Sequence, residues 1–160
     1  GDLQALKALT ADNFEHLTQR DCDGYTPFIL LAQADFGPVM EWMYLRGISI
    51  EEQDHLGRTA LHWVCYRGHR RTAQWLLSRS ASIAHRDHDG MTPIHWAALK
   101  GHIAIADMLI EAGAVHLLQA PDSGGDTPID LATRKRNRYL VLVFYKSILF
   151  QYLFGRPFIW

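Results

Sequence analysis

The chain has 160 residues, of which 48% are hydrophobic, and a formal net charge of -1 with histidine neutral. A nearly neutral chain is a poor candidate for binding nucleic acid, because phosphate binding needs a concentrated basic surface. Two cysteines, Cys22 and Cys65, are too few for a disulfide framework and indicate a reduced, cytosolic setting. The sequence opens inside a repeat-like pattern, so we expect it to be part of a longer protein.

One motif recurs along the chain at a nearly fixed distance. It is DGYTPFILLA from Asp23, LGRTALHWVC from Leu56 and DGMTPIHWAA from Asp89, and a shorter copy follows from Gly125. The first three copies are 33 residues apart and the fourth follows after 35. This period, with a T-P-L-H-x-A-like core, is typical of ankyrin repeats, which the chain resembles. The resemblance predicts an all-α ankyrin-repeat solenoid over residues 1–138. Its helix-turn-helix pairs carry hairpin fingers, in about four repeats plus a truncated N-terminal one. Such arrays usually bind other proteins.

The N-terminal part of the array departs most from the repeat pattern. Residues 3–9 are expected to form the second helix of the truncated repeat, because both ends of an array need a cap. In the first full copy, residues 35–38 replace the usual Gly-His turn with Asp-Phe-Gly-Pro. We therefore expect a distorted turn, with Pro38 opening the second helix of this copy.

The second and third copies follow the pattern closely. Thr59 and Thr92 are expected to cap a first helix, since a threonine hydroxyl can accept from a free amide of the first turn. Leu61, Val64 and Cys65 stand at i, i+3 and i+4 and predict one buried stripe. A glycine, Gly68 in the second copy, should end the first helix and let the chain turn back.

The nine histidines invite a metal-binding interpretation, which we reject. His62 matches His95 and His69 matches His102 in the repeat, so these four belong to the architecture. A histidine near a helix start can donate to the finger backbone. Structural zinc needs four converging ligands, and no cysteine pair is available. We expect no metal, no cofactor and no catalytic residue in this chain.

Residues of the first helices and fingers that lie off the buried stripe predict a binding surface. They lie on the first helices (Trp63, Tyr66, Arg67, Trp96, Leu99, Lys100) and on the fingers at the rim (Tyr25, Arg58, Met91). Trp, Tyr and Arg dominate protein-binding hot spots, and an aromatic groove flanked by cations suits an extended peptide. In the alternative, the tryptophans wedge between neighbouring helices and only stiffen the stack.

The C-terminal segment, residues 139–160, is hydrophobic and follows four cations, Arg134, Lys135, Arg136 and Arg138. Gly155 and Pro157 should stop a helix near Phe154. The resulting helix is too short to span a bilayer comfortably. We therefore expect a membrane-proximal interfacial helix that inserts aromatic residues such as Phe150 and Trp160. The alternatives are a second helix of the last repeat that packs back on the array as a cap, and self-association through an exposed patch.

Three stretches also resemble a narrower family. TALHW at Thr59, GMTPIHWAA at Gly90 and PIDLATRKRN at Pro128 are similar to the N-terminal ankyrin region of DHHC-family protein palmitoyltransferases. The resemblance implies an array on the cytosolic face of an endomembrane such as the Golgi. It also implies that the array recruits substrate proteins, through short peptide segments, to a membrane-bound S-palmitoyltransferase. The Asp-His-His-Cys word is absent, so this chain cannot transfer an acyl group itself. A free-standing ankyrin adaptor or scaffold in signalling is the alternative.

Overall fold

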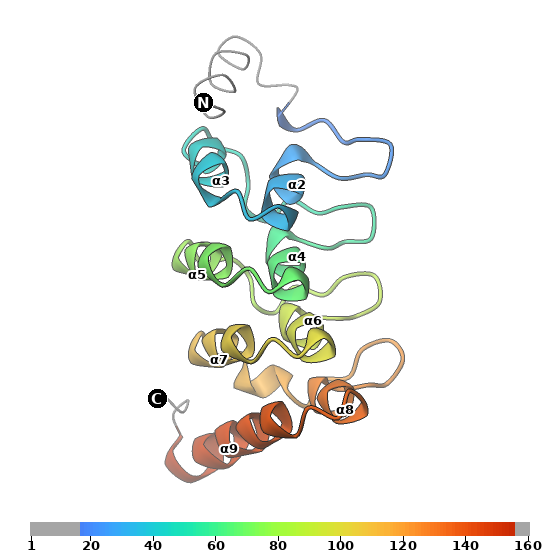
Figure 1. Cartoon of the computed structure of the whole chain (residues 1–160), viewed down its shortest axis with the longest axis vertical. Coiled ribbons are helices and arrows are strands. Elements are labelled where there is room, and N and C mark those ends of the chain that lie inside the picture. The colour runs from blue at the N-terminus through green and yellow to red at the C-terminus, as the bar shows by residue number, and fades with distance from the viewer. Residues whose placement is uncertain (1–16, 156–160) are drawn as a thin grey trace.

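The computed structural model describes residues 17–155, and these form a stack of helix pairs (Figure 1). The helix expected over residues 3–9 lies outside the described part. The helices are α2 (Pro27–Gln33), α3 (Gly37–Tyr44), α4 (Ala60–Arg67), α5 (Arg70–Ser78), α6 (Pro93–Lys100), α7 (Ile103–Glu111), η2 (Ala114–Leu117), α8 (Pro128–Arg134) and α9 (Arg138–Phe154). Within residues 17–155 no strand forms, and extended pairing is limited to an isolated bridge between Gln53 and Thr59. The predicted all-α solenoid is confirmed.

The helices stand in two rows (Figure 1). The first helices of the pairs, α2, α4, α6 and α8, contact one another in succession, and the second helices form the other row. The loops that join one pair to the next project beyond the first row as fingers. A binding surface made of first helices and fingers therefore lies on one side of the molecule.

Each finger is closed by an aspartate at its base. The Oδ1 atom of this residue accepts hydrogen bonds from the backbone N–H groups two and four positions later, at 2.8–3.0 Å. The four aspartates are Asp21, Asp54, Asp87 and Asp122. The tip needs a glycine: Gly57 has φ +73°, and a Cβ there would stand 2.9 Å from the His88 ring. The glycine at position 57 is thus required by both conformation and space.

The predicted helix boundaries are confirmed in the regular repeats. Thr59 is the N-cap of α4 and Thr92 is the N-cap of α6, and Gly68 ends α4 in the left-handed conformation. The stripe of Leu61, Val64 and Cys65 is at most 1% exposed and belongs to a continuous hydrophobic core along the stack. Packing between neighbouring repeats, and not a central core, therefore holds the array together.

The first full repeat has the distorted turn that its sequence predicts. Asp35 has φ +61°, which is unusual for a residue other than glycine. Its carboxylate accepts a hydrogen bond from the Thr72 hydroxyl of the next repeat, which helps to offset this conformation. Helix α3 begins at Gly37 with Pro38 in its first turn, as expected.

The longer step before the fourth repeat accommodates a short helix. The 3-10 helix η2 follows α7, and its residues Ala114, Val115 and Leu117 are buried. It contacts both α7 and α9. This insertion supports one side of the last helix.

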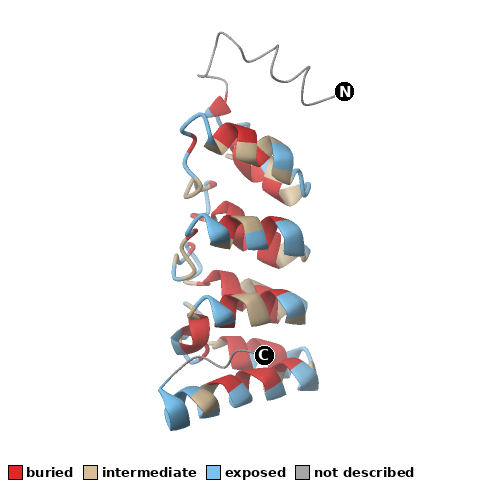
Figure 2. Ribbon diagram, turned by 90° about the vertical axis from the view of Figure 1, so that its left-hand side faces the viewer, coloured by how far each residue is buried: buried red, intermediate tan, exposed pale blue. Residues whose placement is uncertain are grey.

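Helix α9 is the second helix of the fourth repeat and extends beyond it. It has 17 residues and ends at Phe154, with Gly155 at φ +62°, close to the predicted end. Leu140, Val143, Phe144 and Ser147 are buried, so the first half packs on the array as the capping interpretation expected. Exposed residues follow the lower edge of this helix in Figure 2. No helix within residues 17–155 is long and apolar enough to cross a membrane.

Candidate functional site

Four aromatic side chains form a continuous row across three repeats. The row consists of Tyr25 on the first finger, Trp63 and Tyr66 on α4, and Trp96 on α6. Ring centroids are 5.7 Å apart for Tyr25 and Trp63, 5.8 Å for Trp63 and Tyr66, and 5.3 Å for Tyr66 and Trp96. All three contacts are edge-to-face, the arrangement that the aromatic quadrupole favours. The structure thus brings together residues that the sequence separates by up to 71 positions.

Two finger aspartates fix the indole rings. Asp54 Oδ2 accepts from Trp63 Nε1 at 3.0 Å, and Asp87 Oδ2 accepts from Trp96 Nε1 at 2.9 Å. Because the other carboxylate oxygen closes the finger, each aspartate joins a finger to the helix that follows it. Sequence reasoning did not identify these two aspartates as part of the site. A nine-residue spacing from Asp to Trp in two successive repeats was the signal.

Cations lie over the faces of the row. The Arg58 guanidinium is 4.6 Å from the Trp63 ring centroid and 5.9 Å from that of Trp96, and its Nε donates to Asp54 Oδ2 at 3.0 Å. Lys100 Nζ is 4.1 Å from the centroid of Tyr66. Such contacts contribute about 0.5–1 kcal/mol at exposed sites. Burial of Asp54 opposes its ionisation and raises its pKa. The opposite effect is larger, so the pKa of Asp54 is lowered: its carboxylate accepts hydrogen bonds from Arg58, Leu56 and the Trp63 indole and lies beside the Arg58 charge.

The row remains accessible to solvent. Trp63, Tyr66 and Trp96 are half-buried, and the space that they enclose with Arg58 and His62 is too small to hold a water molecule. Trp96 and Leu99 also pack against the hydrophobic core, so Trp96 takes part in the packing of the stack as well as in the row. Neither tryptophan is sealed from solvent.

The remaining predicted residues differ in position. Arg67 is exposed at the end of α4, beside the row. Met91, predicted at the rim, is instead 8% exposed and part of the core, so the prediction is wrong for this side chain. Its backbone N–H donates to Asp87 and its carbonyl accepts from His62, which draws the residue into the base of the finger.

The recurring histidines join backbone groups. In α4, Thr59 N–H donates to His62 Nδ1 at 3.1 Å, and His62 Nε2 lies 3.2 Å from the Met91 carbonyl oxygen. An N–H group can only donate and a carbonyl can only accept, so His62 is the neutral tautomer with its proton on Nε2. His95 repeats this arrangement with Thr92 and Ala120. The predicted structural role of these two histidines is confirmed.

The second histidine pair links successive repeats. His69 Nε2 lies 2.9 Å from the Gln33 carbonyl oxygen, and His102 Nε2 lies 3.1 Å from that of Tyr66. Both carbonyls belong to the end of the preceding first helix, where acceptors have no partner within the helix. Within residues 17–155, no three His, Cys, Asp or Glu side chains are grouped as metal ligands would be.

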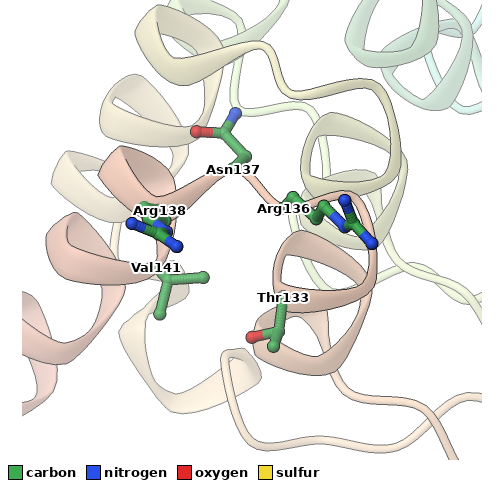
Figure 3. A pocket seen from close by; sticks show the side chains of 5 residues that line it. All are labelled: Thr133, Arg136, Asn137, Arg138 and Val141. Carbon is green, nitrogen blue, oxygen red and sulfur yellow. The ribbon is translucent and has the colours of Figure 1, made fainter.

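A second surface lies at the C-terminal end of the stack. The basic cluster predicted there comprises Arg134, Lys135, Arg136 and Arg138, and all four residues are exposed. Arg134 forms an ion pair with Asp126. Arg136 and Arg138 line a pocket of about 380 Å³ between α8 and α9, together with Thr133, Asn137 and Val141 (Figure 3).

The exposed side of α9 is mainly apolar, with Lys146 and Gln151 also exposed on this helix. Leu142, Tyr145, Leu149, Tyr152 and Leu153 are 53–86% exposed and recur at the spacing of one helix face, which we call the outer face of α9. Arg138 stands at the beginning of this face. Phe150 is half-buried and stacks on Phe154, with ring centroids 4.6 Å apart. Trp160, also predicted as membrane-proximal, lies outside the described residues.

Comparison with known proteins identifies the repeats. A family model described as ankyrin repeats matches three times, over residues 1–87, 30–120 and 84–148. No curated protein gives a significant match. The three matches overlap and together cover almost the whole chain. The chain therefore belongs to the ankyrin-repeat family, and its fold is a non-catalytic module for interaction with other proteins.

Proposed function

We propose that the aromatic row is the surface through which this module binds a short, extended segment of a partner protein. The observation that carries the proposal is the pair of half-buried indoles, fixed by Asp54 and Asp87, beside a tyrosine and two cations. Rings held in place lose little conformational freedom when a ligand binds, so most of the contact energy is retained.

The hydrogen bonding of the row defines the chemistry of the segment. Both indole N–H groups already donate to carboxylates, so the tryptophans offer ring surface and no free donor. Apolar or proline side chains fit such a surface, because they stack on rings without leaving polar groups unpaired. Arg67 is exposed at the edge of the row and can pair with an acidic residue that flanks the apolar part.

The test is a selection of random peptides displayed on phage against the full chain, followed by fluorescence polarisation with the enriched peptides. Trp96→Ala and Trp63→Ala should each weaken binding by about 2 kcal/mol or more, as removal of a hot-spot residue does. Trp75→Ala is the matched control, because Trp75 is also half-buried but lies on α5 in the other row. Equal losses for Trp75 and Trp96, or no enriched peptide, would refute the proposal.

We further propose that the array works at the cytosolic face of an endomembrane, such as the Golgi, as the substrate-recruiting part of a membrane-bound protein S-palmitoyltransferase. The sequence resemblance of the three stretches at Thr59, Gly90 and Pro128 supports this assignment. So does the outer face of α9, because apolar side chains beside a basic cluster suit the interface of an anionic leaflet. Between residues 131 and 155 there are five Lys and Arg and no Asp or Glu, which favours an anionic surface over a second copy of the same basic helix.

Flotation with liposomes tests this part independently of peptide binding. Leu149→Ser with Tyr152→Ser should reduce flotation with anionic liposomes, because both side chains lie on the outer face of α9. Phe36→Ser with Leu45→Ser is the control, since it removes two exposed apolar side chains from the first repeat. Equal flotation of all three proteins would refute membrane contact through α9 and would favour the free-standing adaptor.

A further inference from the structure

The pocket between α8 and α9 has the features of an anion site. Arg136 and Arg138 stand on its two sides, with Thr133 below Arg136 on α8 and Val141 below Arg138 on α9 (Figure 3). Among the described residues neither arginine forms an ion pair, whereas Arg134 of the same cluster is paired with Asp126. The pocket therefore has two guanidinium groups available to an external ligand, and guanidinium forks match the geometry of phosphate oxygens.

The backbone holds the two arginines apart and at the surface. Arg136 has φ +57°, and its N–H donates to the Thr133 carbonyl at 2.9 Å, so the end of α8 turns sharply. Asn137 then caps α9 by accepting from Leu140 N–H at 3.1 Å. Its Nδ2 reaches the Gly101 carbonyl of the preceding repeat at 3.5 Å. The junction is thus tied to the array, and a ligand would meet a site that is already formed.

The size and position of the pocket indicate what kind of phosphate it holds. Its volume of about 380 Å³ is within the range of small-molecule sites, so a lone phosphate ion would leave most of it unfilled. Arg138 also begins the outer face of α9, so the pocket and this apolar face share one residue. A phosphorylated polar group joined to hydrocarbon chains satisfies both surfaces at once.

We propose that this pocket binds the phosphorylated headgroup of an anionic membrane lipid, with Arg136 and Arg138 on the phosphate and the outer face of α9 against the acyl region. The proposal rests on the membrane contact of α9 proposed above, and adds a specific headgroup site to it. The basic charge then acts in two ways: Lys135 attracts any anionic surface, and the two pocket arginines select a terminal phosphate monoester, which phosphatidylserine lacks.

The test compares Arg138→Gln with Lys135→Gln in the full chain, using sedimentation with two sets of vesicles. One set contains phosphatidylinositol phosphate and the other contains phosphatidylserine at the same total charge. If the attraction is only diffuse, each lost cation lowers the partition coefficient about fivefold, whichever cation is lost. A headgroup site predicts that Arg138→Gln loses at least tenfold more than Lys135→Gln on the phosphoinositide vesicles, and that the two variants are equal on phosphatidylserine. Arg136→Gln should behave like Arg138→Gln, and the circular dichroism of all three should match the parent.

The other outcomes overturn the proposal in distinct ways. If the parent binds both vesicle types equally and the variants do not differ, the membrane contact stands and the headgroup site is wrong. If the parent binds no anionic vesicle, the membrane contact itself is wrong. If soluble inositol phosphate or a phosphopeptide binds with dependence on Arg138 while vesicles do not, the pocket recognises a soluble phosphate and the lipid assignment fails.

Discussion

Acidification should destabilise the array through its buried histidine caps, of which His62 is the clearest. Burial, and then the nearby charge of His85, lower the pKa of His62 to about 4 from an ordinary value of 6.5. The cause can be traced to atoms: a second proton on Nδ1 would face the Thr59 N–H, a donor that needs an acceptor. The folded state therefore requires neutral His62, while the unfolded chain accepts the proton freely.

The size and direction of the effect follow from the two pKa values. The contribution of His62 is fully present above pH 6.5 and is lost as the pH falls through the window from 6.5 to about 4. At pH 5 the unfolded state is almost fully protonated and the folded state is not, which costs about 2 kcal/mol of the free energy of unfolding. The loss approaches about 3 kcal/mol near pH 4. Burial also lowers the pKa of His95, so that residue acts in the same direction.

Urea denaturation at pH 7.5 and pH 5, followed by circular dichroism, measures this loss. The variant His62→Gln is the comparison, because glutamine can still accept from the Thr59 N–H but does not titrate. We expect the variant to be less stable at pH 7.5 and to lose about 2 kcal/mol less than the parent on acidification. Parallel losses in the two proteins would show that His62 is protonated in the folded state or that its cap contributes nothing.

Three further changes have expected results. Asp87→Asn should destabilise the third repeat by about 1–3 kcal/mol and change the fluorescence of the indole that it holds, because one carboxylate oxygen serves the finger and the other the ring. An unchanged emission spectrum would contradict this anchoring. Gly57→Ala should cost more in melting temperature than Gly47→Ala, because both have positive φ but only the first would bring a Cβ against a neighbouring ring. Equal losses would mean that the ring moves aside freely. Finally, iodoacetamide at pH 8 should modify Cys22 and spare Cys65, whose burial raises the pKa of its thiol, until urea exposes the second site. Labelling of both thiols in the folded protein would contradict the burial of Cys65.

The repeat period made most of the fold predictable, since identical turn and cap residues recur where the chain needs them. The helix ends at Gly68 and Phe154 and the irregular turn at Asp35 follow from local chemistry, which a sequence displays directly. The site was predictable only in part. The helical spacing of Trp63 and Tyr66 reveals a shared face, but the bond from Asp54 to Trp63 joins a loop to a helix, and periodicity within one helix does not report it.

The error at Met91 has the same origin. A finger tip is normally exposed, and composition alone places Met91 at the rim of the surface. Its burial depends on the hydrogen bond from His62 of the previous repeat, which only stacking of the two repeats creates. The peptide, lipid and acyltransferase assignments are proposals. The repeats determine the framework, and the surface residues on that framework determine which partner binds.

The uneven distribution of charge along the stack has an electrical consequence. Residues 17–130 contain nine Lys and Arg against fourteen Asp and Glu, whereas residues 131–155 contain five Lys and Arg and no acidic residue. Positive charge is therefore concentrated from the end of α8 through α9, although the molecule as a whole is nearly neutral. A negatively charged surface of any kind should therefore attract this end of the molecule, over a distance of roughly 10 Å at 0.1 M salt, beyond which the field is largely screened.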